Sequence, residues 1–480
     1  MSKKVVIQPV TRVEGHAKIT VSLDDAGRVT DTKVQVVELR GFENFCIGRP
    51  VEEMPRIVTR ICGVCPWAHH VAAGKAADAV FQAEVPETGR KLRELAYMAH
   101  FVHSHLLHFF FLSGADFLAE PDMDYHLRNI IGLSQKNPQL TQQVVRVRKL
   151  AQQITEIMAG KAIHPDVVVP GGFSKPLGKE QRDEIYGMAK ECLDFTRFAL
   201  DFAKKKVFAP LLPGLKEEQA LKTGFLGMVG PGGGLDFYDG KLRLMKTEGD
   251  YQEFDGADYL DYIGEHAEDW TFMKFPYDKS VGSFSMDPDH PVGIYRTNSL
   301  ARLNVCDFIP TALAQKELEE FRGTVGRIAQ HTFLYHWARL IEALYAAERM
   351  MELLEDPALT DPYTRNKVEP CGGRGVGIVE APRGTLIHDY QADAKGMIEK
   401  VNLIVGTTHN NAAINISAFR AARKLLENGD WGEEALNKIE MAIRAYDPCF
   451  SCATHKMDGS LAVQVELRDQ HGNTLKTLQN

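Results

Sequence analysis

Apolar and polar residues alternate along the beginning of the chain. The alternation runs from Val5 to Val37 with a break at Asp25-Ala26-Gly27, which predicts a β-hairpin with a glycine-containing turn. Glu14 interrupts the alternation next to Gly15, where a glycine kink can direct a side chain inward. From spacing alone, a solvated charge on the hairpin is the simpler interpretation of Glu14.

Apolar residues three and four positions apart dominate much of the remaining chain, and this spacing predicts α-helices. The predicted long helices cover residues 92–117, 139–161, 177–208 and 310–354. The last of them is long enough to be a central element of the fold. The other expected elements are a short helix at 52–59, a polar loop at 402–411 and two helices at 412–428 and 433–446.

Residues 210–297 are rich in Gly, Pro, Tyr and Asp and predict an α+β excursion from the helical part. Their cluster Gly230-Pro-Gly-Gly-Gly234 lacks the Gly-Lys-Ser/Thr ending of a phosphate loop, so we reject nucleotide binding there. Residues 375–388 predict two strands joined by a Pro-Arg-Gly turn with Arg383 at its tip, and a hairpin turn accounts for the glycines better than a dinucleotide fingerprint. The expected fold class is α+β, mainly α: a central bundle of long helices with peripheral β-hairpins.

The composition adds limits on partners and location. At 480 residues and 44% hydrophobic content, the chain is long enough to bury a large core. A formal net charge of −8 argues against nucleic acid as a partner, because phosphate binding needs a concentrated basic face. No apolar run approaches the roughly 18 residues of a membrane span, and the first residues lack a secretory signal. We therefore expect a cytoplasmic protein, although a subunit exported with a partner would have the same features.

Both ends of the chain carry a Cys-x-x-Cys, Cys62 with Cys65 and Cys449 with Cys452. Four sulfur ligands suit zinc, iron, nickel or an iron-sulfur cluster, and do not suit magnesium or calcium. Eight cysteines are too few for a disulfide framework in a chain of this length. The other four have no pairing pattern and are expected to be buried free thiols.

The residues alone leave the metal open. A structural zinc is the commonest use of four cysteines, yet zinc sites are usually built within a few tens of residues, whereas these pairs are separated by almost the whole chain. The stretches around them also hold more polar groups than a structural site needs, namely Glu14, Glu43, Arg383 and His455. His69 follows the first pair by one helical turn, where it can point back toward the sulfurs, although a packed core histidine is the simpler interpretation.

Longer motifs surround both cysteine pairs. Residues 40–65 read Arg-Gly-Phe-Glu-x(4)-Gly-Arg-x(4)-Met-Pro-x-Ile-x(2)-Arg-Ile-Cys-Gly-Val-Cys, and residues 447–455 read Asp-Pro-Cys-x-x-Cys-x-x-His. With Glu-Ala-Pro-Arg-Gly at 380–384 between them, the chain closely resembles the large subunit of nickel-iron hydrogenases from Val10 to His455. The resemblance is strongest to the cytoplasmic branch, which includes the viologen-reducing hydrogenases associated with heterodisulfide reductase and the deazaflavin- and NAD-reducing ones.

The resemblance implies the nickel-iron hydrogenase large-subunit fold over residues 1–455, with an N-terminal β-hairpin at 1–38. It implies a nickel-iron centre whose iron carries one carbonyl and two cyanides. Cys62 and Cys449 would be terminal nickel thiolates, and Cys65 and Cys452 would bridge nickel to iron.

Residues around the iron ligands also match the family. Arg383 and Thr407 would donate hydrogen bonds to the cyanides. Pro382 and Leu386 would form an apolar wall beside the carbonyl.

Other matching residues have supporting roles in the family. His69 and Asp447 would orient a sulfur and the arginine. Glu43, the backbone carbonyl of Leu403 and His455 would hold a magnesium or iron ion through water-rich coordination.

The implied activity is reversible heterolytic cleavage of dihydrogen to protons and electrons. The proton would pass to the Cys449 thiolate or to a base at Arg383, and Glu14 would be the first relay, because burial raises the pKa of a carboxyl group toward neutral pH. The resemblance therefore reverses the interpretation of Glu14 that spacing alone favours.

The resemblance also implies partners. No cysteine set for an iron-sulfur cluster remains, so the electrons would leave through an iron-sulfur small subunit, across an interface above about 2,000 Å². A further iron-sulfur or flavin subunit, such as heterodisulfide reductase, would follow. A maturation protease would remove residues 456–480. Ser104 departs from the family pattern, because many exported relatives place an Asp there beside the arginine.

Two other functions compete with catalysis. A hydrogen-sensing regulatory protein would have the same site and very low turnover. A structural or quinone-pocket relative, as in complex I, would have lost the metal, and the four intact cysteines count against it.

Overall fold

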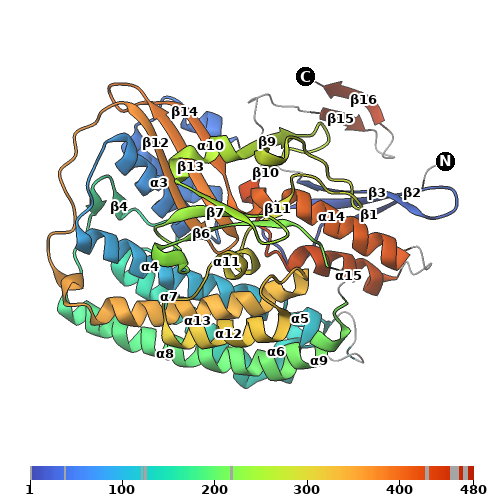
Figure 1. The fold of residues 1–480 in the computed structure, drawn as a ribbon, viewed down its shortest axis with the longest axis horizontal. Helices are drawn as coiled ribbons and strands as arrows, with labels where there is room; N and C mark the ends of the chain where they lie inside the picture. Colours follow the sequence, from blue (N-terminus) through green and yellow to red (C-terminus); the bar gives the residue numbers. More distant parts are fainter. Residues whose placement is uncertain are drawn as a thin grey trace.

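The structure, a computed structural model, consists mainly of helices with several small sheets (Figure 1). It describes residues 3–36, 39, 41–119, 123, 127–216, 220–426, 432–453, 464–468 and 474–479. The helices are α1 (Phe42–Cys46), α2 (Met54–Ile57), α3 (Pro66–Val80), α4 (Glu87–Leu106), α5 (Gly114–Phe117), α6 (Ile130–Lys136), α7 (Pro138–Ala159), α8 (Lys179–Ala203), α9 (Ala209–Leu211), α10 (Tyr259–Tyr262), α11 (Ser299–Val305), α12 (Ala312–Val325), α13 (Tyr335–Glu355), α14 (Gly406–Leu426) and α15 (Glu433–Arg444).

The strands form six small sheets within the described residues. They are β1 (Lys3–Ile7), β2 (Ala17–Leu23), β3 (Val29–Val36), β4 (Val168–Val169), β5 (Gly172–Phe173), β6 (Gly224–Val229), β7 (Lys241–Met245), β8 (Tyr251–Phe254), β9 (Ile263–Ala267), β10 (Lys274–Asp278), β11 (Tyr295–Arg296), β12 (Gly373–Ala381), β13 (Gly384–Ala392), β14 (Ile398–Ile404), β15 (Gln464–Arg468) and β16 (Thr474–Gln479). The orders are β1-β2-β3, β4-β5, β11-β6-β7-β8, β9-β10, β12-β13-β14 and β15-β16.

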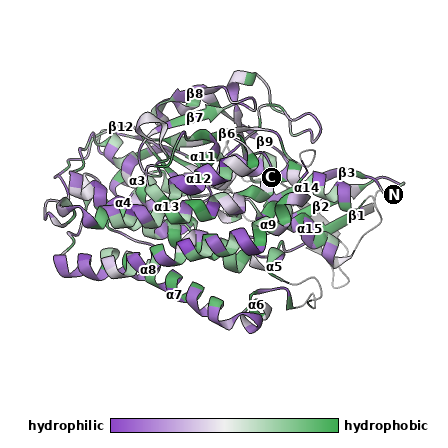
Figure 2. Ribbon diagram, turned by 60° about the horizontal axis from the view of Figure 1, so that its bottom comes forward, coloured by the Kyte–Doolittle hydropathy of each residue, from purple (hydrophilic) through white to green (hydrophobic). Residues whose placement is uncertain are grey.

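A bundle of long helices forms the largest layer of the molecule (Figure 1). Helix α13 packs against α4, α8 and α12, and α7 packs against α4 and α8. On α8 the residues Ile185, Ala189 and Cys192 are buried at spacings of four and three, while hydrophilic residues cover much of the outer surface of α7 and α8 (Figure 2). These helices confirm the predicted α+β, mainly α fold class. Within the described residues, no helix is long and apolar enough to cross a membrane.

Two predicted helical and loop boundaries are wrong. The single helix expected at 310–354 is two helices, because α12 ends at Gly326, whose φ of 90° only glycine adopts readily. The polar loop expected at 402–411 is the end of β14 and the first turns of α14. Its polar residues face the interior, where Asn410 donates to Thr297 Oγ1 at 3.1 Å and Asn411 donates to the Lys274 carbonyl at 2.8 Å.

The N-terminal sheet places the front of the chain beside the C-terminal helices (Figure 1). Strands β2 and β3 form the predicted antiparallel hairpin, and β1 adds a third strand. Alternate residues of β2 are buried, from Ala17 through Ile19 and Val21 to Leu23. Strand β3 packs against α14, and the N–H of Val34 donates to the Asn415 side chain of that helix at 2.8 Å. Residues 210–297 contain β6 to β11 with only the short helices α9 and α10, as the predicted α+β excursion requires.

Helix α3 lies directly against β12 because both surfaces are made of small residues. Gly375 and Gly377 share one face of the strand, and Ala72 and Ala76 face them from the helix. A Cβ at Gly377 would lie 2.0 Å from the Ala72 carbonyl oxygen and 2.4 Å from the Ala76 nitrogen. These glycines therefore bring the helix close to the sheet, and the hairpin turn predicted to explain them is not their reason.

We expect Gly377→Ala to lower the free energy of unfolding by about 1–3 kcal/mol, because the added methyl group overlaps the α3 backbone. The matched control is Gly187→Ala on the exposed face of α8, where a Cβ meets nothing within 4 Å. Because alanine favours the helix over glycine, this control gains up to about 1 kcal/mol. Thermal and denaturant unfolding of both variants checks the result, and equal midpoints would contradict the close packing of α3 on β12.

Candidate metal centre

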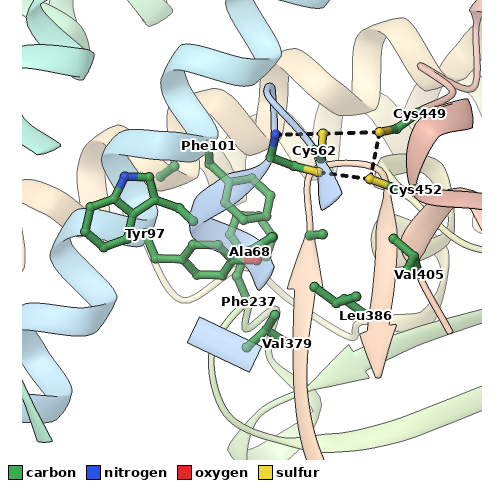
Figure 3. Packing of buried hydrophobic residues seen from close by; sticks show 14 of the residues in the cluster. Cys62, Ala68, Tyr97, Phe101, Phe237, Val379, Leu386, Val405, Cys449 and Cys452 are labelled. Atoms are coloured by element: carbon green, nitrogen blue, oxygen red, sulfur yellow. Dashed lines mark hydrogen bonds between the residues drawn. The ribbon is translucent and has the colours of Figure 1, made fainter. Parts of the chain in front are cut away.

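Four buried cysteine sulfurs lie within 4.8 Å of one another, at the meeting point of the two ends of the chain. The sulfurs of Cys449 and Cys452 are 2.8 Å apart, those of Cys62 and Cys449 are 3.3 Å apart, and those of Cys65 and Cys452 are 3.6 Å apart. Figure 3 shows three of these sulfurs converging beside the apolar side chain of Leu386. The two distant Cys-x-x-Cys motifs therefore form one cluster.

Local backbone geometry directs each pair toward the other. The N–H groups of Val64 and Cys65 donate to the sulfur of Cys62 at 3.3 and 3.1 Å, which folds the first pair tightly at the start of α3. Beyond α15, Asp447 has a φ of 51° and Pro448 cannot continue a helix, so the chain turns toward the first pair.

Glu14 approaches the cluster from the N-terminal segment. It pairs with Cys449 in a parallel β-bridge, and its Oε2 accepts from Cys449 Sγ at 2.9 Å and from Ser451 N at 3.2 Å. Gly15 has a φ of 78°, and a Cβ there would lie 2.6 Å from Ser451 N. Burial raises the pKa of the Glu14 carboxyl group, and negative charge on Cys62 raises it further. The solvated position favoured by spacing alone is therefore wrong.

Arg383 lies buried at the turn between β12 and β13. Its Nη2 donates to Asp447 Oδ1 at 3.0 Å, while Nε and Nη1 have no hydrogen-bond partner among the described residues. Although burial opposes it, the negative charges of Asp447 and Cys449 raise the pKa of the Arg383 guanidinium. Pro382 and Leu386 flank the arginine in sequence and are buried. A charged donor with two unsatisfied nitrogens thus lies beside an apolar surface.

Arg302, on α11, holds the end of β12 that leads into this turn. Its nitrogens bond both oxygens of Glu342 at 2.5 and 2.7 Å and Glu380 Oε2 at 2.8 Å. Its Nη2 also donates to the Pro382 carbonyl at 3.2 Å, one residue before Arg383. Sequence reasoning missed this buried network, and its only signal is a charged residue within the apolar run Leu-Ala-Arg-Leu-Asn-Val at 300–305.

Three further residues singled out from the sequence are buried. The Nε2 atom of His69 lies 3.6 Å from Cys452 Sγ. Thr407 Oγ1 accepts from Cys449 N at 2.8 Å, so the hydroxyl proton remains able to donate. Ser104 is fully buried, and within the described part of the chain its hydroxyl has no hydrogen-bond partner.

Glu43 and Leu403 meet away from the sulfurs. Glu43 Oε1 accepts from Leu403 N and from Lys274 Nζ, both at 2.8 Å. Lys274, which the sequence reasoning missed because no motif surrounds it, is buried and also lies 3.2 Å from Glu265. His455 falls outside the residues that the structure describes.

The charge state of the thiols fits a bound cation. Burial raises the pKa of the Cys449 and Cys452 thiols well above the usual value. Although burial opposes it, hydrogen bonds from Cys449 and its neighbours hold the pKa of the Cys62 thiol well below that value. One thiolate is therefore what the chain itself stabilises, and further thiolates need the positive charge of a metal.

Comparison with known protein families identifies the same two regions. The nickel-dependent hydrogenase family matches residues 40–123 and 291–455, and a HoxL-like family matches residues 4–39. The vhu-type F420-non-reducing hydrogenase of Methanococcus voltae contains a polypeptide that is 42% identical, and the match covers 88% of this chain and 99% of that protein. The NAD-reducing hydrogenase HoxS subunit beta of Cupriavidus necator is 38% identical over 99% of both chains.

Solved structures share the fold. A crystal structure of an NAD+-reducing [NiFe]-hydrogenase in the H2-reduced state has a TM-score of 0.88 and 40% sequence identity, and it covers 94% of this chain and 99% of its own. The [NiFeSe]-hydrogenase of Desulfomicrobium baculatum has a TM-score of 0.72 at 24% identity, which supports the fold alone. A family match over more than half of the chain, full-length relatives and the shared architecture agree, and the chain belongs to the nickel-dependent hydrogenases as a large, catalytic subunit.

Proposed function

We propose that this chain splits dihydrogen reversibly and heterolytically into protons and electrons at a nickel-iron centre held by its four clustered cysteines. The observation that carries this proposal is the Glu14 carboxylate, 2.9 Å from the sulfur of Cys449 inside a four-sulfur cluster. A structural metal site needs no carboxyl group with a raised pKa beside its ligands. When bound, the metal centre supplies the Lewis acidity that makes dihydrogen far easier to deprotonate.

Cys62 and Cys449 act as terminal nickel ligands, and Cys65 and Cys452 bridge nickel and iron. Metal–sulfur bonds of about 2.3 Å allow two sulfurs on one metal to be up to about 4.6 Å apart. The 3.6 Å between the sulfurs of Cys65 and Cys452 lies within that limit and supports a shared ion.

The iron side of the centre faces Arg383. Its unsatisfied Nε and Nη1 suit two anionic acceptors, such as cyanide ligands, and the Thr407 hydroxyl supplies another donor. Pro382 and Leu386 offer an apolar surface for a carbonyl ligand. Ser104 brings no charge, so Asp447 is the carboxylate that directly neutralises Arg383 in this chain.

Protons leave through the N-terminal segment. The Cys449 sulfur, or a base at Arg383, takes the proton first, and the Cys449 thiol already donates to Glu14 at 2.9 Å. Glu14 then carries the proton outward, because a carboxyl group with a raised pKa both accepts and releases protons near neutral pH.

A magnesium or iron ion binds near the start of α1, held by Glu43, the carbonyl of Leu403 and His455. Glu43 already accepts from the Lys274 ammonium at 2.8 Å, so the ion shares this carboxylate with a cation. Glu265, 3.2 Å from Lys274, supplies the second negative charge that makes such a neighbourhood stable.

Electrons leave to an iron-sulfur small subunit, then to a further electron-transfer subunit that is either iron-sulfur or flavin. The exposed residues Arg60 and Gly63 border the buried Cys62, so the cluster lies just below the surface. His164 adjoins this surface, with Nδ1 3.0 Å from the Thr59 carbonyl. Relatives named as subunits of NAD-reducing and F420-non-reducing hydrogenases support a multi-subunit, cytoplasmic enzyme. Reduction assays with viologen, NAD and deazaflavin distinguish the acceptor classes.

Residues 1–455 form one large-subunit domain, and a maturation protease removes residues 456–480 after nickel is inserted. The described part of this extension is the hairpin of β15 and β16. The mass of the chain in the purified, metal-loaded complex tests the cleavage.

Purification of the chain with its co-purifying subunits tests the function. We expect nickel and iron by elemental mass spectrometry, carbonyl and cyanide bands by infrared spectroscopy, and rapid dihydrogen-dependent reduction of a viologen dye. A single tetrahedral zinc without diatomic bands would contradict the proposal. Very low turnover with the same metals would instead favour the hydrogen-sensing role.

We expect Cys449→Ser to abolish activity and to lower the nickel content, because a serine hydroxyl is a much poorer ligand for a soft metal than a thiolate. Cys371→Ser is the matched control, since this partly buried cysteine lies outside the cluster and only donates to the Val80 carbonyl at 3.4 Å. Metal analysis and dye reduction of both variants check the result. Full nickel occupancy and activity in Cys449→Ser would contradict the ligand assignment.

We expect Glu14→Gln to keep nickel and iron but to slow dihydrogen–deuterium oxide exchange by about 10²–10⁴-fold, because an amide cannot relay protons. Glu440→Gln is a control carboxyl group, which bonds Thr11 and Arg444 and lies outside the cluster. Isotope exchange followed by mass spectrometry separates proton transfer from electron transfer. Exchange at the wild-type rate in Glu14→Gln would end the relay assignment.

The pH dependence of dihydrogen oxidation follows from the raised pKa of Glu14. Glu14 must be deprotonated to accept a proton, so the rate falls as the pH drops through that pKa, above the ordinary carboxyl range. Glu14→Gln removes this acid limb from its residual activity. Rate profiles of both enzymes check this, and the same acid limb in the variant would assign it to another group.

A further inference from the structure

Beyond the four cysteines, a chain of hydrogen-bonded side chains extends from the cluster into the sheet. His69 Nε2 lies 3.6 Å from Cys452 Sγ, and His69 Nδ1 lies 3.1 Å from His388 Nε2. His388 Nδ1 lies 2.5 Å from the hydroxyl oxygen of Tyr390. All four side chains are fully buried, so water does not compete for these contacts.

The fold sets this line of contacts through two elements. His69 belongs to α3, four residues after Cys65, and α3 packs against β12 and β13. His388 and Tyr390 are two residues apart on β13, so both point to the same face of the sheet. The His69 and His388 ring centroids are 5.3 Å apart, and those of His388 and Tyr390 are 5.7 Å apart.

The acceptor at one end fixes the direction of every hydrogen bond. A metal-bound thiolate only accepts, so His69 Nε2 must carry a proton to bond Cys452. Complete burial favours the neutral imidazole, whose Nδ1 is then an acceptor. His388 must therefore donate from Nε2 and accept at Nδ1, which requires the Tyr390 hydroxyl to donate. Burial raises the pKa of Tyr390, so its hydroxyl keeps the proton.

We propose that Tyr390 is a positioning residue for the metal centre, because its hydroxyl fixes the tautomers of His388 and His69 so that His69 donates to the sulfur of Cys452. The inference rests on the proposed function, in which Cys452 bridges nickel and iron. A hydrogen bond to a bridging thiolate withdraws electron density from the sulfur, so Tyr390 influences the metals without touching them.

Without the Tyr390 hydroxyl, nothing in this chain of contacts favours the Nδ1 acceptor form of His388. The other tautomer places an acceptor at His388 Nε2 opposite the acceptor Nδ1 of His69, and His69 must then change tautomer or rotate. In either case its hydrogen bond to Cys452 is lost. The sulfur becomes a stronger donor, and back-donation from iron to a carbonyl ligand increases.

The test uses the purified, metal-loaded complex and infrared spectroscopy of its diatomic ligands. We expect Tyr390→Phe to retain nickel and iron while its carbonyl band shifts to lower wavenumber. Tyr345→Phe is the matched control, because it also removes a buried hydroxyl, which donates only to the Leu235 carbonyl at 3.3 Å. This control should lose comparable stability and leave the carbonyl band in place.

A second variant shows whether the effect passes through His388. His388→Gln supplies an amide N–H to His69 whatever residue 390 is, so Tyr390→Phe should cause no further shift in that background. An unshifted carbonyl band in Tyr390→Phe, or the same shift with and without His388→Gln, would overturn the inference. Absence of diatomic bands from the wild-type complex would instead contradict the proposed function itself.

Discussion

Four sulfur ligands for one centre come from positions 387 residues apart, and closing that loop costs entropy of about 5 kcal/mol by the logarithmic scaling of loop closure. Contacts around the cluster must offset this cost. The β-bridge between Glu14 and Cys449 is one of them, and the hydrogen bond of the Thr11 hydroxyl to Glu440 is another. The N-terminal sheet and the last helices are thus adjacent for a chemical reason, since neither cysteine pair alone provides four ligands.

Buried charge is the second constraint on the centre. Arg302 lies between Glu342 and Glu380, and Arg383 lies against Asp447, all of them almost inaccessible to water. Removing one member of such a group would leave an uncompensated charge in the interior, which costs several kcal/mol. The interior can therefore present a permanently charged guanidinium to the metal ligands while the protein around it stays folded.

The sequence was informative where chemistry requires a particular residue type at a particular spacing. The cysteine pairs, the strand–turn–strand around Arg383 and the amphipathic helices of the bundle were all predictable for that reason. Glu14 was not predictable from spacing, because its burial depends on Cys449 and Ser451 at the other end of the chain. Lys274 and the 402–411 segment were missed because polar residues that bond each other in the interior have the same sequence pattern as a solvated loop.

The β-bridge between Glu14 and Cys449 also determines when the fold can be finished. Its partners are 435 residues apart, so at about 5–20 residues per second a ribosome needs roughly 20 to 90 s to synthesise the second after the first. Throughout that interval the N-terminal strands wait for their neighbours, and the first two thiols stay accessible from the side on which the last two will arrive. Translation order therefore leaves the cavity open long enough for an assembly factor to deliver its cargo before the polypeptide closes over it.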